Sequence, residues 1–484
     1  MLIRNVRVWP VADAESCREL GPRIGGASGR ELADVPVTDV RITGDRVAER
    51  APGLRAARGE DEIDAAGGTL LPGLHDHHVH LRALAAARAS VEAGPPHVRT
   101  ADGLASRLRA ADAAAPPGAW LRCVGYHESV AGPLDRWALD QMLAGRPVRV
   151  QHRTGVQWVV NSAAVALLGL DACDQPGVER DAAGRPTGRL WRMDGWLAGR
   201  VPGVPPDLAA VSLQAASFGV TGFTDATPGA ADDDLAALAA AVADGTIAQR
   251  VHHMAPAHLS AAPRGRLTVG PVKVLLDDDT LPRLDEFGGQ ISRAHAAGRP
   301  VAVHCVTRVQ FVLTLAALEA AGRLAGDRIE HGAVIPAECV RDLRGLTVVT
   351  QPHFVAERGE QYATDVAPGD LPDLWRLRTL LEAGVAVAAG TDAPFGGADP
   401  WHVMRAATRR PANIGPGEAV TGAQAIGLFL GEPTAPATPR LVAPGQPADL
   451  VLLRCPPLAA ARALDSDLVA ATLVGGEVVF ARDV

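Results

Sequence analysis

Residues 70–81, LLPGLHDHHVHL, combine an apolar run with a cluster of histidines. The segment from Leu70 to Leu74 predicts a short buried strand because it is apolar, and Pro72-Gly73 marks a point where regular structure can stop. Four histidines and one aspartate follow within residues 75–80. The cluster therefore follows directly on a buried strand, which fixes its position. A histidine-rich turn on the surface would have no such strand before it.

His78 and His80 are two residues apart in this cluster. Side chains at positions i and i+2 of an extended chain point in the same direction, so these two imidazoles can share one metal ion. His75 and His77 have the same spacing in the opposite register. Spacing alone leaves open which of the two pairs binds a metal.

The composition is that of a large globular protein without a polyanionic partner. The 484 residues are 47% hydrophobic and 21% charged, with a formal net charge of −8, which is enough to bury a large core. No long basic run indicates nucleic acid or an anionic membrane. No stretch approaches the roughly 20 apolar residues of a membrane span. We expect a small molecule as the partner.

The cysteines and the N-terminus favour a reducing compartment. The opening MLIRNVRVWP has no apolar core long enough for a signal peptide. Without an export signal, cysteines that form no CxxC pair are expected to be reduced and structural. They are Cys17, Cys123, Cys173, Cys305, Cys339 and Cys455. A cytoplasmic enzyme is the resulting expectation.

Strand patterns alternate with helical patterns through residues 69–94 and 206–439. Eight β/α units with buried apolar strands predict an α/β fold of the (β/α)8, or TIM barrel, type. The predicted barrel strands are 70–74, 220–225, 249–254, 271–276, 300–304, 327–331, 347–351 and 385–391.

Short β segments lie at both ends of the chain. Residues 2–9 alternate between apolar and polar side chains, and residues 39–48 predict a hairpin around Gly44. Residues 445–453 and 467–480 predict further strands. Because chain termini often lie close together, residues 1–68 and 440–484 are expected to form one small β-sandwich; the alternative is two independent flaps.

Residues 95–205 are too many for one loop between a strand and a helix. They contain strand patterns at 120–125 and 147–151 and helical patterns at 101–113 and 162–168. We interpret the segment as an α/β insertion after the first barrel strand, which would serve as a lid or substrate wall.

Metal-competent side chains fall at or near the ends of the predicted barrel strands. The C-terminal strand ends of a barrel converge on one site. A single histidine there would most often be structural, but six such groups predict a metal site. The six are His78, His80, Lys273, His304, His331 and Asp392.

Five motifs on these strands, in this order, resemble the amidohydrolase superfamily of metal-dependent hydrolases. They are DHHVH (76–80), VKVLLD (272–277), AVHC (302–305), RIEH (328–331) and AAGTD (388–392). The closing PGQPADLVLL and LVGGEVVF are similar to its terminal β-sandwich. NSAAVALLGL (161–170) and GRPTGRL (184–190) resemble the branch of N-substituted formamide deformylases, amidohydrolase family 3.

The resemblance implies one or two metal ions. His78, His80 and Asp392 would hold the more buried ion, and His304 and His331 the second. The ligand set suits zinc, with iron, manganese or nickel as alternatives. Superfamily members are often dimers or larger, so by analogy a homo-oligomer is an option.

The resemblance also implies that Lys273 carries a carboxylate on its amine and bridges the two metals. An unmodified lysine is a cation and repels a metal, whereas the carbamate offers an anionic oxygen. The alternative is an unmodified lysine paired with Asp277 or Asp278.

These parts imply hydrolysis of a carbon–nitrogen bond in an amide, N-substituted formamide or cyclic amide. Metal-activated hydroxide would attack the carbonyl, with Asp392 as general acid and base. His331 would ligate metal or polarise the carbonyl. His353 would contact substrate or lie in a solvent-facing turn, and His127 would donate to the pocket or lie in a loop.

The insertion departs from the resembled branch at two positions. Val156 stands where that branch commonly has a histidine five residues before the Asn-Ser pair, and Arg192 stands where it tends to have an acid. The substrate pocket is therefore expected to differ.

Two other functions stay open from the sequence. A deaminase of the same fold usually carries Glu three residues after the fifth-strand histidine, where this chain has Thr307. An inactive binding protein would have no physical reason to keep the histidines and aspartate together.

Overall fold

The computed structural model describes residues 1–10, 27–203, 206–228, 232–259 and 262–482. The chain divides into two compact units: unit 1 comprises Met1–Leu81 and Leu208–Val484, and unit 2 comprises Arg82–Asp207. No helix among the described residues is both long enough and apolar enough to cross a membrane. The described cysteines are free, and Cys17 lies outside the described residues.

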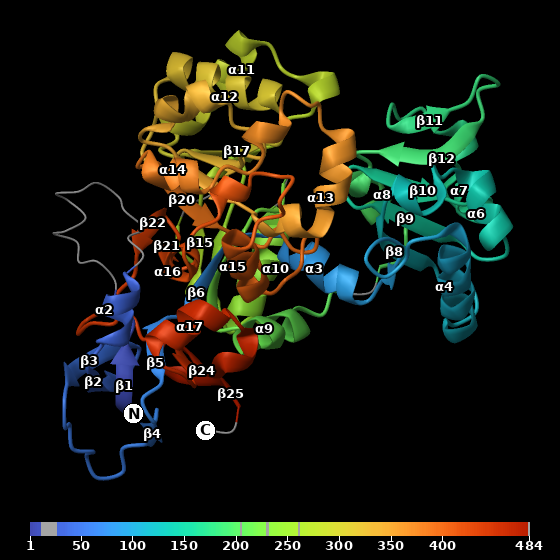
Figure 1. Cartoon of the computed structure of the whole chain (residues 1–484). Helices are drawn as coiled ribbons and strands as arrows, with labels where there is room; N and C mark the ends of the chain where they lie inside the picture. Colours follow the sequence, from blue (N-terminus) through green and yellow to red (C-terminus); the bar gives the residue numbers. More distant parts are fainter. Residues whose placement is uncertain (11–26, 204–205, 229–231, 260–261, 483–484) are drawn as a thin grey trace. The chain divides into compact units, whose positions relative to one another are not determined.

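Unit 1 contains two parallel sheets that supply the predicted barrel strands (Figure 1). The first has the order β15-β14-β13-β6, and the second has the order β16-β17-β18-β19-β20. Their bounds are β6 Leu74–Val79, β13 Val220–Asp225, β14 Arg250–His253, β15 Leu267–Val269, β16 Val272–Val274, β17 Val301–Cys305, β18 Arg328–His331, β19 Thr347–Thr350 and β20 Ala386–Ala389. The fold is thus α/β, and closure of the two sheets into one barrel stays a prediction.

Helices alternate with these strands along the chain. The helices of unit 1 are α2 Gly29–Ala33, α9 Leu208–Ser217, α10 Asp232–Ala243, α11 Leu284–Ala296, α12 Arg308–Ala321, α13 His353–Asp365, α14 Arg378–Glu382, α15 Pro400–Thr408, α16 Gly422–Gly427 and α17 Pro457–Ala463, with α3 Leu81–Arg88 at the junction of the units. Parallel strands need such crossover connections.

The predicted first barrel strand, 70–74, is wrong. Residues 69–72 form β5 in a different sheet, and the barrel strand is β6, which contains the histidines. The chain passes from one sheet to the other at Gly73, where a Cβ atom would overlap the side chain of Thr221. Only glycine allows this close approach. The short strand β15 was not predicted.

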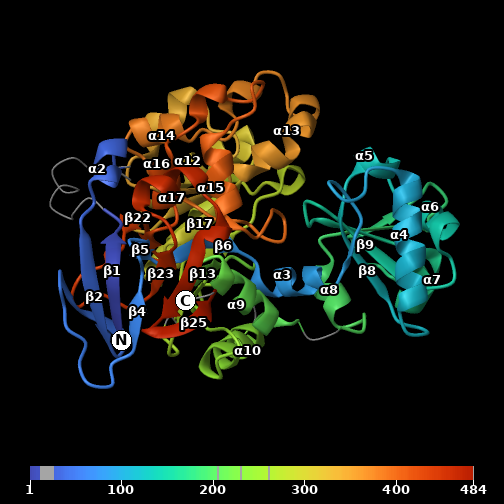
Figure 2. The same ribbon diagram turned by 60° about the horizontal axis from the view of Figure 1, so that its bottom comes forward.

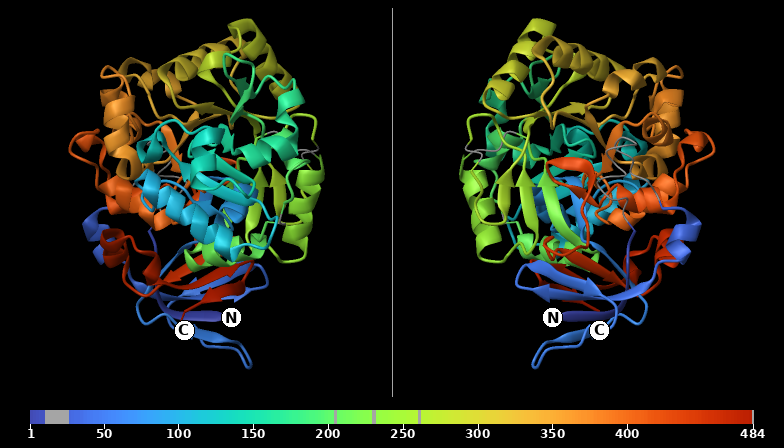
Figure 3. Two further views of the ribbon diagram at one scale, coloured as in Figure 1. Left: turned by 90° about the vertical axis from the view of Figure 1, so that its right-hand side faces the viewer. Right: turned by 90° about the vertical axis from the view of Figure 1, so that its left-hand side faces the viewer.

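Strands from both ends of the chain pair in one eight-stranded sheet of unit 1, in the order β25-β24-β23-β5-β1-β2-β3 with β4 beside β1. Figure 3 shows these terminal strands, coloured blue and red, side by side. The bounds are β1 Leu2–Val8, β2 Val37–Thr43, β3 Arg46–Ala51, β4 Glu62–Asp64, β5 Thr69–Pro72, β23 Leu450–Leu453, β24 Val469–Val474 and β25 Glu477–Ala481.

The two ends join where Leu70 lies opposite Leu452 in the antiparallel pair of β5 and β23. Side chains from these strands form one buried apolar cluster, which includes Ile3, Val40, Leu450 and Leu473. Removal of that apolar surface from water favours the joined arrangement over two independent flaps. The sandwich description stays a prediction.

Unit 2 has a six-stranded sheet of its own, in the order β11-β12-β10-β9-β8-β7. Figure 2 shows helix α4 (Ala101–Ala114) along strands β8 and β9. The remaining elements are β7 Val91–Glu92, β8 Leu121–Tyr126, β9 Val148–His152, β10 Gln157–Val160, β11 Val178–Arg180, β12 Pro186–Trp191, α5 Glu128–Ala131, α6 Arg136–Met142, α7 Ser162–Leu168 and α8 Asp194–Ala198. A role for residues 95–205 as a lid stays a prediction.

Candidate active site

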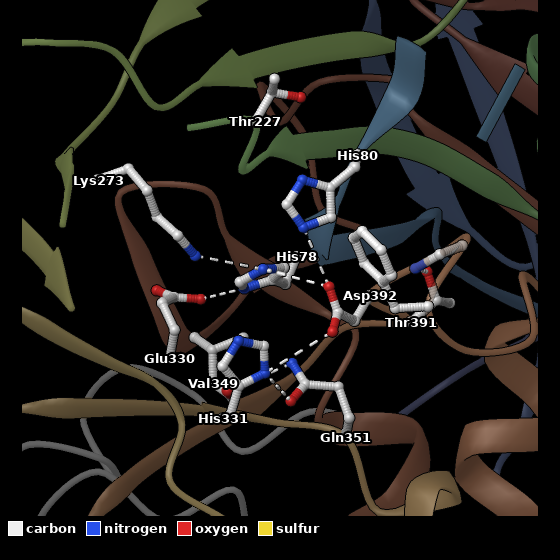
Figure 4. Close-up of polar contacts among 12 residues, drawn as sticks. His78, His80, Thr227, Lys273, Glu330, His331, Val349, Gln351, Thr391 and Asp392 are labelled. Carbon is white, nitrogen blue, oxygen red and sulfur yellow. Dashed lines mark hydrogen bonds and ion pairs between the residues drawn. The ribbon is translucent and has the colours of Figure 1, made fainter. Parts of the chain in front are cut away.

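His78, His80 and Asp392 lie together at the C-terminal ends of β6 and β20. The Asp392 Oδ1 atom is 3.1 Å from His80 Nε2 and 3.5 Å from His78 Nε2. Figure 4 shows both imidazoles directed at this carboxylate. The three donor atoms lie within 4.8 Å of one another, and all three residues are buried. Of the two histidine pairs with this spacing, His78 and His80 are the pair that the structure brings to the Asp392 carboxylate; metal binding by this pair stays a prediction.

Backbone contacts between the two strand ends fix this cluster. The Asp392 N–H donates to the His78 carbonyl at 2.7 Å, and the His80 N–H donates to the Ala393 carbonyl at 2.9 Å. Gly390 allows the approach, because a Cβ there would overlap the backbone of His78. Asp392 itself has a φ of 52°, a left-handed conformation that is uncommon for non-glycine residues and concentrates at functional sites.

Hydrogen bonds between Asp76 and Thr391 also connect these two strand ends. The Asp76 carboxylate accepts hydrogen bonds from the Thr391 N–H at 2.9 Å and from the Thr391 hydroxyl at 2.5 Å. It also accepts one from the His78 N–H at 3.2 Å. Burial raises the pKa of Asp76 to about 6, although these hydrogen bonds favour the ionised form. The sequence analysis did not single out either residue.

Glu330 is a further residue that the sequence analysis missed. Its carboxylate bonds to His78 Nδ1 and to the guanidinium of Arg328, which also donates to the His77 carbonyl at 2.7 Å. A carboxylate on Nδ1 orients a ligating imidazole and leaves Nε2 for the metal. The available signal was the spacing of Arg328 and Glu330 on one strand, which places both on the same side.

His304 and His331 form the second predicted ligand group. Their ring centroids are 4.6 Å apart, and that of His331 is 4.8 Å from that of His78. His331 Nδ1 is 2.8 Å from the Gln351 side-chain oxygen, so Nδ1 carries the proton and Nε2 is free to act as a ligand. Like Asp392, His331 has a positive φ, 68°. Gln351 was not predicted.

Lys273 is the only lysine in a chain with 47 lysine and arginine residues. Its Nζ atom is 3.4 Å from His78 Nε2. The carboxylate of Asp278, one predicted alternative partner, accepts hydrogen bonds from Thr307 and Gln310 instead. A buried lysine amine can lose its proton, whereas an arginine guanidinium stays charged, so a lysine at this position suits chemistry that needs a neutral amine.

The electrostatics of the cluster favour the ligand forms of these side chains. Burial and the neighbouring Lys273 lower the pKa of His78 to about 3, so the imidazole is neutral. Burial opposes ionisation of Asp392, but the hydrogen bond from His80 and the adjacent His78 and His331 hold its pKa well below its ordinary value. Neutral histidines and an ionised carboxylate are the forms that bind metal.

The other predicted histidines lie elsewhere. His75 Nε2 is 2.9 Å from the Thr224 hydroxyl, and His77 is fully buried. His353 is the first residue of α13 and is fully buried, so the solvent-facing alternative is wrong; burial lowers its pKa to about 4. His127 lies in unit 2, directly after β8. Substrate contacts by His353 and His127 stay predictions.

Residues 61–480 match the family model described as the amidohydrolase family. The chain belongs to this amidohydrolase family. This amidohydrolase is 26% identical over 465 residues to the N-substituted formamide deformylase of Arthrobacter pascens, with 81% of this chain and 85% of the relative covered. The predicted superfamily and branch are thereby confirmed, and the chain is a hydrolase that acts on carbon–nitrogen bonds.

Two solved structures show the same fold. An uncharacterized metal-dependent hydrolase from Pyrococcus horikoshii OT3 aligns with a TM-score of 0.72 at 17% identity, over 95% of this chain and 98% of that one. The atrazine chlorohydrolase TrzN from Arthrobacter aurescens TC1, complexed with zinc, aligns with a TM-score of 0.56 at 16% identity, over 99% and 94%. This amidohydrolase therefore shares its architecture with these hydrolases.

Proposed function

We propose that the chain uses a divalent metal, zinc in the first instance, to hydrolyse an amide, an N-substituted formamide or a cyclic amide. The observation that carries the proposal is the convergence of His78 Nε2, His80 Nε2 and the Asp392 carboxylate within 4.8 Å in a buried site. Two imidazoles and a carboxylate are a donor set that zinc accepts. The carboxylate of Glu330, on strand β18, contacts His78 Nδ1, and this contact fits a role of His78 as a metal ligand.

A bound divalent metal would supply a water nucleophile that is activated at neutral pH. Asp392 is placed to take the proton from that water, since its carboxylate is ionised and lies at the ligand cluster. The same proton then passes to the leaving nitrogen as the carbon–nitrogen bond breaks. One water is consumed, and one carboxylic acid group and one amine group are formed; the two groups stay on one molecule when the amide is cyclic.

His331 would hold the substrate carbonyl or a second metal through Nε2. The hydrogen bond of Nδ1 to Gln351 keeps the ring in one tautomer and one orientation. Burial, outweighing the neighbouring Asp392 carboxylate, lowers the pKa of His331, so the ring stays neutral at physiological pH. A neutral imidazole can serve either role.

Lys273 would bear the carboxylate that bridges two metals. Burial lowers the pKa of its amine, which increases the fraction of neutral amine. The neutral amine adds to the carbon of carbon dioxide and releases one proton, which leaves an anionic carbamate beside His78. The carbamate can be detected by ¹³C NMR after incubation with ¹³C-labelled carbon dioxide. Because Lys273 is the only lysine, the terminal amine is the only other amine of the chain that could give a carbamate signal.

We expect Lys273→Ala to lower the metal content from about two ions per chain to about one, because a two-metal site loses its bridging oxygen donor. Metal per chain is measured by mass spectrometry after reconstitution in bicarbonate. Lys273→Glu is the matched variant, since its side chain supplies a carboxylate without carbon dioxide. An unchanged metal content in Lys273→Ala would contradict the bridging role.

A deaminase is less well supported than an amide hydrolase. Thr307 occupies the position where a deaminase of this fold usually has Glu. Its hydroxyl accepts from the Gln310 N–H at the start of α12 and donates to Asp278 at 2.9 Å. That position therefore offers a helix cap in place of a carboxylate.

The reaction class is tested by release of amine from a panel of N-substituted formamides, linear amides and cyclic amides, with zinc-reconstituted protein. We expect one carboxylic acid for each amine released or ring opened. If the protein released ammonia from aminated heterocycles and hydrolysed none of the amides, the proposal would be overturned in favour of a deaminase.

A further inference from the structure

A second cluster of metal-competent side chains lies in unit 2, where two adjacent parallel strands end. His127 follows the last residue of β8, and His152 is the last residue of β9. Tyr126 and His152 are paired across the two strands. The carboxyl ends of neighbouring parallel strands meet at one edge of a sheet, so the two histidines project from the same edge. Figure 2 shows α5 and β9 in this unit.

Glu128 lies between the two imidazoles. Its Oε2 atom is 3.1 Å from His152 Nε2 and 3.8 Å from His127 Nε2. One donor atom from each of the three residues lies within 4.8 Å of the other two. The histidine side chains are 13% and 14% exposed, whereas Glu128 is 45% exposed. The cluster is thus partly shielded and still open to an ion from solvent.

Beside the other nitrogen of each histidine lies a hydroxyl group from the residue two positions further along the chain. His127 Nδ1 is 2.9 Å from the Ser129 hydroxyl, and His152 Nδ1 is 2.7 Å from the Thr154 hydroxyl. The backbone N–H groups of Ser129 and Thr154 donate to the same Nδ1 atoms at 3.2 and 3.3 Å. These contacts fix each ring with its Nε2 edge toward Glu128, the edge that a metal ion would contact.

Glu128 supplies the third donor, a carboxylate oxygen beside the two imidazole nitrogens. An anionic oxygen and two imidazole nitrogens match the donors of zinc and neighbouring divalent ions.

We propose that His127, Glu128 and His152 form a divalent-metal site in unit 2. Zinc is the expected ion, and the three ligands leave a coordination position for water or an external group. Because each Nδ1 accepts from a backbone N–H, the ring proton is on Nε2, and His152 Nε2 donates to Glu128 at 3.1 Å. A metal ion at the two Nε2 atoms would take the place of these protons, which would be released to solvent.

The first test counts zinc in the full chain with the other site blocked. His78→Ala/His80→Ala protein is loaded with Zn²⁺ and freed of excess ion, and we expect about one zinc per chain to remain. Adding His152→Ala should remove it. His97→Ala is the control, because His97 also pairs with a glutamate of unit 2, Glu92 at 2.8 Å, but without a second histidine. Equal zinc in the His152 and His97 variants would overturn the proposal.

The second test needs no substitution. Crystals of the wild-type chain soaked in Zn²⁺ are measured at the zinc absorption edge, and an anomalous peak is expected between the two Nε2 atoms and the Glu128 carboxylate. Absence of that peak, with zinc present at Asp392, would overturn the site while leaving the proposed hydrolase intact. A peak at Glu128 without zinc at Asp392 would support the site in unit 2 and overturn the proposed hydrolase site.

Discussion

Asp392→Asn lowers kcat/KM for amide hydrolysis by roughly 10²- to 10⁴-fold, the range for removal of a positioned acid–base group. The amide cannot take a proton from water at neutral pH, and it is a weaker metal ligand than the carboxylate. Asparagine tolerates the left-handed conformation of this residue, φ 52°, so the backbone contacts to His78 and His80 should survive. The kinetics are measured with metal in excess.

Asp467→Asn is the matched control, because that carboxylate is 85% exposed and pairs with Arg482 at the surface. It should leave kcat/KM unchanged. An Asp392→Asn enzyme that retains wild-type kcat/KM and metal content would show that Asp392 has neither role.

Glu330→Gln lowers the free energy of unfolding by roughly 3–5 kcal/mol, the cost of removing one partner from a buried ion pair. Arg328 is 2% exposed and Glu330 is fully buried, so the neutral amide leaves a buried guanidinium without its counter-charge. His78 Nδ1 loses its carboxylate partner in the same step. The free energy is measured by denaturant unfolding of metal-free protein, so that metal loss does not contribute.

The surface pair Arg4–Glu62 provides the comparison. Its atoms are 3.1 Å apart, but the side chains are 45% and 43% exposed, and exposed ion pairs contribute little. Glu62→Gln should therefore leave the unfolding curve close to that of the wild type. An equal effect of the two substitutions would mean that the Arg328–Glu330 pair does not stabilise the strand.

The parallel strands of unit 1 could be predicted because their cores are continuous apolar runs. Residues 300–304 and 385–391 were predicted, and β17 (Val301–Cys305) and β20 (Ala386–Ala389) lie at those places. The hairpin around Gly44 was predicted from turn chemistry and is present as β2 and β3. Both kinds of signal are local in the sequence.

The errors in the fold arise from contacts between distant residues. The apolar run at 70–74 is shared by two sheets, and the division at Gly73 depends on the approach of Thr221 from another strand. The helix α13 was not predicted, so a solvent-facing turn was one of the two alternatives for His353, although this residue begins the helix and is buried. The three-residue strand β15 is too short to show a pattern.

The ligand set could be predicted because each residue has a position on its own strand. The groups that orient the ligands could not. Glu330 reaches His78 across 252 positions of the sequence, and Thr391 reaches Asp76 across 315. Neither the pairing nor its burial is visible in a local motif. That Lys273 is the only lysine of the chain is a further signal, which can be found in the composition.

The most direct test of a metal-dependent hydrolase is activity on one amide substrate measured together with metal content on the same samples during removal and return of the ion. We predict that activity falls in proportion to the metal retained after chelation and returns when zinc is restored. Full activity in protein freed of metal at His78, His80 and Asp392 would contradict the account.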